Sequence, residues 1–75
     1  MNNVIPVIGE DYRYLELKEP KAIVRLARVV QGNPYSVYWL TVIRPLTEGD
    51  PEFVPGRDFK VMGPFEKAGW DLERP

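Results

Sequence analysis

The stretch from Tyr35 to Arg44 constrains the fold more than any other part of this chain of 75 residues. β-branched and aromatic residues dominate it, and it contains no Gly, Pro, Asp or Asn. This composition is typical of a strand in a packed sheet. Both faces would be mostly apolar, so we expect a central strand that is covered on two sides or closed into a small barrel. On that strand we expect Tyr35 and Trp39 to face the core.

Residues 20–31 permit two interpretations, and the fold class depends on the choice between them. As a helix, the segment places four apolar residues at helical spacing: Ile23, Leu26, Ala27 and Val30. As a strand, it gathers four on one face, with only Arg28 out of place: Ala22, Val24, Leu26 and Val30. The helical apolar arc is too wide for a surface helix of so small a protein, and β-branched residues lose rotamer freedom in a helix. We therefore favour a strand, which residues 32–34 would connect to Tyr35–Arg44 as an antiparallel hairpin.

Two further segments alternate as half-buried strands do, namely Tyr12–Lys18 and Arg57–Met62. Pro45–Gly56 is rich in prolines and acidic residues, and we expect it to form a loop. The sequence thus predicts a mainly β fold, either a small antiparallel sheet or an SH3-like, partly open barrel of about four or five strands. The alternative is an α+β fold in which residues 20–31 form one helix on a three-stranded sheet.

A chain of this length forms at most one domain with a small core. We expect a flexible arm over residues 1–9, a globular domain over 10–65 and a loosely ordered tail over 66–75. The first residues, Met-Asn-Asn, are uncharged, and no apolar run approaches the ~20 residues that a membrane span needs. These features favour a cytoplasmic protein that does not bind a membrane, and we expect a monomer.

Residue types that carry chemistry are sparse. The absence of Cys and His removes thiolate zinc sites, thiol nucleophiles and the most common general base. No Gly-rich phosphate loop occurs, and Ser36, the only serine, has no histidine to activate it. The acids of residues 48–52 are too few for a calcium loop, and Pro51 interrupts them. We therefore expect no catalytic residue, no metal site and no cofactor.

Charge is distributed unevenly along the chain. Residues 20–47 contain four basic residues and no acidic ones, whereas acids predominate on both sides. The pattern indicates either pairing within the fold or a basic strip that meets a partner: Lys21, Arg25, Arg28 and Arg44. The acidic tail adds two large apolar residues that could dock on a partner, Trp70 and Leu72. Trp70 could instead fold back and cap the core. These six residues are the candidates for partner binding.

Three classes of function are compatible with these features. The first is non-enzymatic, stoichiometric binding to a larger protein through the six candidate residues. The second is a small nucleic-acid-binding β-barrel with four contact residues: Arg25, Arg28, Arg44 and Tyr38. The sequence pI near 5.3 disfavours this second class, because modules that contact phosphates are usually basic. The third is a structural subunit, such as a virion component, which would self-assemble.

The chain combines short length, no Cys or His, aromatic-rich strands and apolar-acidic arms. In this whole-chain character it resembles the small host-takeover proteins of bacteriophages. Among those it is similar to compact inhibitors of host RNA polymerase, which act without chemistry by holding polymerase subunits or displacing the specificity factor. The resemblance implies binding to RNA polymerase subunits and a block of transcription initiation in the host cytoplasm. It rests on no matched motif and assigns no residue a role.

Overall fold

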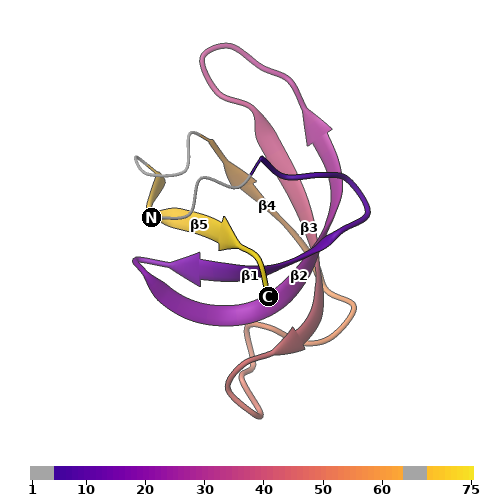
Figure 1. Ribbon diagram of the computed structural model, residues 1–75, viewed down its shortest axis with the longest axis vertical. Helices are drawn as coiled ribbons and strands as arrows, with labels where there is room; N and C mark the ends of the chain where they lie inside the picture. Colours follow the sequence, from indigo (N-terminus) through magenta and orange to yellow (C-terminus); the bar gives the residue numbers. More distant parts are fainter. Residues whose placement is uncertain (1–4, 64–67) are drawn as a thin grey trace.

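A computed structural model describes residues 5–63 and 68–75 of the protein (Figure 1). Within these ranges the chain is mainly β and forms one open antiparallel sheet of five strands: β1 (Asp11–Glu16), β2 (Glu19–Val30), β3 (Val37–Pro45), β4 (Asp58–Met62) and β5 (Trp70–Glu73). The strand order is β4-β3-β2-β1-β5, so four consecutive strands form a meander and the last returns beside the first. This confirms the predicted small antiparallel sheet.

The strand interpretation of residues 20–31 is confirmed, and the helical alternative is wrong. β2 pairs with β1 along one edge and with β3 along the other. Its residues Ala22, Val24 and Leu26 are fully buried on the inner face, the side of the sheet that carries the core. A helix would have turned Val24 away from Ala22 and Leu26, whereas the period of two places all three against the core.

A register shift explains why Arg28 was out of place in the predicted strand. Leu26 pairs with Leu40 but Arg28 with Trp39, so Ala27 has no partner on β3. Such a β-bulge exchanges the two faces of the strand beyond it. As a result Val29 packs against the core, while Arg28 is exposed on the outer face. Val30, which we expected on the apolar face, is exposed there as well.

β3 confirms the central strand predicted over residues 35–44, although it runs from Val37 to Pro45. It pairs with β2 and β4, and its inner face buries Leu40 and Val42. The expectation that Tyr35 and Trp39 face the core is wrong. Tyr35 precedes the strand and is 51% exposed, and Trp39 is half-buried on the outer face. Because both faces of this strand are apolar, alternation alone could not decide which one lies inside.

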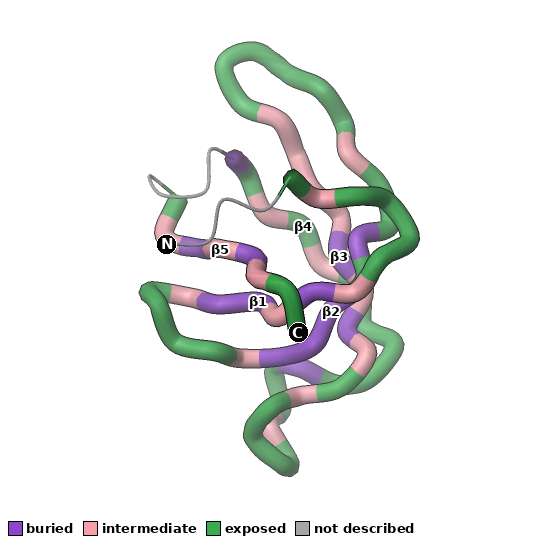
Figure 2. The backbone as a smooth tube through the Cα atoms, in the orientation of Figure 1, coloured by how far each residue is buried: buried purple, intermediate pink, exposed green. Residues whose placement is uncertain are grey.

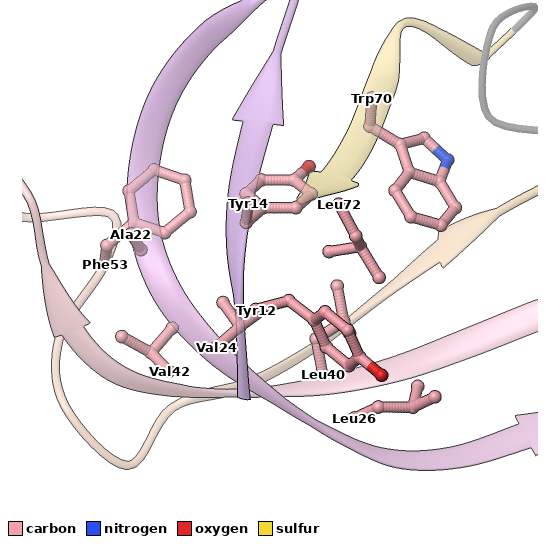
Figure 3. Packing of buried hydrophobic residues seen from close by; sticks show 10 residues of the cluster. All are labelled: Tyr12, Tyr14, Ala22, Val24, Leu26, Leu40, Val42, Phe53, Trp70 and Leu72. Carbon is pink, nitrogen blue, oxygen red and sulfur yellow. The ribbon is translucent and has the colours of Figure 1, made fainter. Parts of the chain in front are cut away.

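The expectation of a loosely ordered tail is wrong for residues 70–73, which form β5; residues 66–67 lie outside the described residues. β5 pairs antiparallel with β1, and both Trp70 and Leu72 are buried. Figure 3 shows Trp70 beside Tyr14 over the same core. The Trp70 ring also meets the ring of Tyr38, and its Nε1 donates a hydrogen bond of 2.7 Å to the carbonyl oxygen of Met62. One side chain thus connects the two outermost strands.

The sheet is curled, so that β1 and β5 run across the direction of β3 and β4 (Figures 1 and 2). The core side chains gather on its inner face (Figure 3). They come from four strands and from the β3–β4 connection: Tyr12, Tyr14, Ala22, Val24, Leu26, Leu40, Val42, Phe53, Trp70 and Leu72. Phe53, from the predicted loop, inserts its ring near Tyr14 and Phe59 at centroid distances of 5.9 and 6.0 Å. Ring contacts of this kind stabilise a core beyond the area that they bury.

The segment before β1 was expected to be a flexible arm. Residues 1–4 lie outside the described residues. From residue 7 onward the backbone is tied to the domain, because the Val7 amide donates to the Tyr12 hydroxyl and the Gly9 amide to the carbonyl of Leu26. The side chains of Ile5 and Ile8 are nevertheless exposed.

Replacing Trp70 with alanine should lower the free energy of unfolding by about 3–5 kcal/mol, since the change empties a large core site. The companion variant Trp39→Ala, on the outer face, should cost markedly less. Urea unfolding followed by circular dichroism measures both. Equal losses in the two variants would contradict the placement of Trp70 in the core, and Trp70→Phe supplies a folded comparison that lacks only the indole hydrogen bond and part of the volume.

Alkaline pH should destabilise the fold through Tyr14. Burial raises the pKa of its hydroxyl above the ordinary value of 10.0, and the hydrogen bond to Glu16 and the charge of Glu16 raise it further. The folded state therefore retains a proton that the unfolded state releases. This contribution is fully present below about pH 10 and is lost as the pH rises, by up to ~1.4 kcal/mol per pH unit.

Tyr14→Phe should flatten this alkaline decline, whereas Tyr35→Phe, at an exposed tyrosine, should leave it unchanged. The measurement is the unfolding free energy in urea at a series of pH values on both sides of the ordinary tyrosine pKa. Parallel curves for wild type and Tyr14→Phe would refute the assignment.

Candidate functional site

The outer face of β2, β3 and β4 aligns side chains into three rows across the strands. Neighbouring residues such as Leu40, Phe59 and Val61 belong to the core or pack against it, so the alternate residues point the opposite way. The pairing registers define an apolar row, Val30–Val37–Met62, a central row, Arg28–Trp39–Lys60, and a polar row, Arg25–Thr41–Asp58. We call these nine residues the outer face.

The central row places an indole between two cations. The Arg28 Cζ lies 5.5 Å and the Lys60 Nζ 5.7 Å from the centroid of the Trp39 ring. Each contact is a cation–π interaction worth about 0.5–1 kcal/mol at an exposed site. Within residues 5–63 and 68–75, neither cation forms an ion pair with an acidic side chain. The row therefore carries two positive charges that the described part of the fold does not neutralise.

The polar row differs because its charged side chains have hydrogen-bonding partners. The Arg25 Nε lies 2.8 Å from one Asp11 carboxylate oxygen, and the Arg25 Nη2 lies 3.3 Å from the other. The Thr41 hydroxyl donates a hydrogen bond of 2.6 Å to Asp58. The charged side chains of this row already have hydrogen-bonding partners within the fold. The row therefore has less tendency to bind a charged ligand than the central row has.

The apolar row borders the central row on its other side. Val30 is 43% and Met62 57% exposed, and Val37 between them is half-buried. This row lies near the β2–β3 connection, which extends from the body as an exposed loop (Figure 2) and carries the exposed Tyr35. Single exposed apolar side chains are common, but a row of them beside a tryptophan is a contiguous apolar surface.

The structure separates the six residues predicted to bind a partner. Trp70 and Leu72 are core residues and are not available for docking, so the capping alternative for Trp70 describes its position. The basic residues fall into two groups. Arg25 and Arg28 belong to the outer face. Lys21 lies 3.8 Å from Glu19, and Arg44 is exposed opposite Ile23, both toward the other end of the β2–β3 pair.

Sequence reasoning missed the central feature of this face. It counted Trp39 among the core residues and gave Lys60 and Met62 no role. One signal was present, namely Arg28 as the polar exception in an otherwise apolar strand face. The register that places Arg28 beside Trp39 depends on the bulge at Ala27, and the position of Lys60 depends on the pairing of β3 with β4; no local pattern encodes either.

Other kinds of site find little support in the described part of the chain. It contains no cluster of three or more acidic side chains able to hold a metal ion. This described part also contains no helix that is long and apolar enough to cross a membrane. No protein-family model, curated protein or solved structure matches the chain. The outer face is thus the candidate that remains, on its geometry alone.

Tryptophan fluorescence should distinguish the outer face, which carries Trp39, from the core, which contains Trp70. In Trp70→Phe, the remaining Trp39 should emit at longer wavelength and be quenched more by iodide than by caesium, because Arg28 and Lys60 attract the anion. In Trp39→Phe, the buried Trp70 should emit at shorter wavelength and resist both quenchers. Adding Lys60→Gln to the Trp70→Phe chain should reduce the preference for iodide. Equal quenching of the two tryptophans would contradict the description of the outer face.

Proposed function

We propose that the protein is a non-enzymatic regulator that binds a larger protein through the outer face of β2, β3 and β4. The observation that carries this proposal is the half-buried Trp39 between Arg28 and Lys60, beside the exposed apolar row. Trp, Arg and Met are enriched in protein interfaces, and Trp and Arg are the side chains whose truncation most often costs binding energy. Trp39 takes the anchoring role that we had predicted for Trp70.

Nucleic-acid binding is the second candidate, because an indole next to an arginine can also stack on a base. Two features favour a protein partner. The apolar row offers no contact that a phosphate backbone would use. In addition, Asp11 and Asp58 contribute negative charge at the polar row, and the whole chain has a net charge of −1. A single-strand binding surface would be expected to be basic along its length.

The more specific form of the proposal names the partner as subunits of bacterial RNA polymerase, with the protein acting as a bacteriophage inhibitor in the bacterial cytoplasm. This part rests on the resemblance in whole-chain character. The mechanism would be occlusion without chemistry. Trp39 and the apolar row would slow dissociation from the polymerase. The charges of Arg28 and Lys60 would raise the association rate and fix the orientation.

The test is recovery of partners by the tagged protein from bacterial lysate, with and without nuclease. RNA polymerase subunits should be recovered despite nuclease, and Trp39→Ala should reduce their recovery by at least about tenfold, as loss of a central anchor does. Val54→Ala, which truncates an exposed apolar residue in the β3–β4 connection, should leave recovery unchanged.

Each alternative result has a definite meaning. Recovery that disappears with nuclease would favour the nucleic-acid candidate. Recovery of the protein alone would favour self-assembly and the structural-subunit class. A nuclease-resistant, Trp39-dependent partner other than RNA polymerase would retain the binding face and reject the polymerase assignment.

A further inference from the structure

We infer that the outer face accepts an acidic, extended segment of its partner, with a carboxylate over the central row and a large apolar side chain over the apolar row. This inference rests on the proposed function and specifies the chemistry of the segment that is bound. It is supported by the charge balance of the rows, their spacing and their order.

The charges of the three rows indicate that the ligand carries an anionic group at the central row only. Arg25 is matched by Asp11, and Thr41 occupies an oxygen of Asp58, whereas Arg28 and Lys60 have no acidic partner among the described residues. Their contacts with Trp39 leave guanidinium and ammonium donors available, because Arg has five N–H donors and Lys three, and one ring contact does not occupy them all. A carboxylate that arrives here can pair with either cation while its stem packs on the indole.

Row spacing sets the pattern of the bound segment. Val37, Trp39 and Thr41 are two residues apart on β3, so adjacent rows are about 7 Å apart. Alternate side chains of an extended peptide have the same spacing. A Glu or Asp at one position therefore meets the central row when a Leu, Ile or Phe two positions away meets the apolar row.

The order of the three rows determines on which side of its acidic residue the bound segment carries the apolar residue. The same order disfavours a nucleic acid. A second acid placed two positions away on the other side would approach Asp58 and be repelled. A neutral or basic residue fits there instead. A nucleic-acid strand carries one phosphate per nucleotide and cannot present an anion at one row, an apolar group at the next and a neutral group at the third.

The test is a nuclear magnetic resonance titration of the full-length, isotopically labelled protein with three probes. The first is the peptide Ser-Ser-Ser-Glu-Ser-Leu-Ser with blocked ends. The second replaces its Glu with Gln, and the third is an oligothymidylate. We expect the Glu peptide to shift the Trp39 indole resonance and the amides around Arg28, Lys60 and Met62, and to bind at least about fivefold more tightly than the Gln peptide.

Charge-reversed variants supply the matched control. Lys60→Glu should weaken binding of the Glu peptide by at least about fivefold, and Arg74→Glu, an equal charge change outside the outer face, should not. Because Lys60→Glu adds a charge near Asp58, Lys60→Gln provides a second variant, for which a smaller loss in the same direction is expected. The amide spectrum of each free variant reports whether it is folded.

The outcomes separate this inference from the proposed function. Equal binding of the Glu and Gln peptides would overturn the assignment of an acidic ligand, and so would tighter binding of oligothymidylate at the same residues. If no peptide binds while Trp39-dependent capture of a protein persists, the ligand chemistry is wrong and the binding function stands. If that capture also fails, the proposed function is wrong as well.

Discussion

The side chain of Trp70 joins the two ends of the sheet, and the rest of the structure depends on that connection. The strand order places β4 and β5 at opposite edges, yet Trp70 on β5 donates its indole hydrogen bond to the backbone of Met62 on β4. A flat sheet could not bring these edges together, so the sheet must curl around the aromatic core. Trp70 also meets the rings of Tyr14 and Tyr38, and a chain of this size, which buries only ~60% of its unfolded surface, has a small core to hold the curl.

The same curl determines what the convex side can present. With Tyr38 and Leu40 turned inward, Trp39 must point outward, and the pairing partners on β2 and β4 then place Arg28 and Lys60 beside it. The bulge at Ala27 is essential to this arrangement. Without it, Arg28 would continue the inward face of β2 and leave an unpaired charge in the core, which would be strongly unfavourable. The arrangement of the outer face and that of the core therefore both depend on the same strand register.

Much of the architecture could be predicted from the sequence because it depends on local composition. The β-branched and aromatic content of residues 20–44 favours strands, and the alternation over residues 57–62 places Phe59 and Val61 on one face. The identity of the inner face of β3 could not be predicted. Both of its faces are apolar, and the choice depends on side chains from distant segments, such as Phe53 and Trp70, that fill one side. Short polar tails with a few apolar residues are usually loosely held, which is why β5 was missed.

The pairing of β5 with β1 has a consequence for the order in which the protein folds. β1, β2 and β3 are each paired with the strand that follows in the chain, whereas Arg13 on β1 and its partner Glu73 on β5 are about sixty residues apart. Closing so long a loop costs more entropy than forming a hairpin, so we expect the meander to assemble first and β5 to dock last. Until residue 73 has left the ribosome, Tyr14 lacks its neighbour Trp70, and the growing chain carries an aromatic surface without its cover.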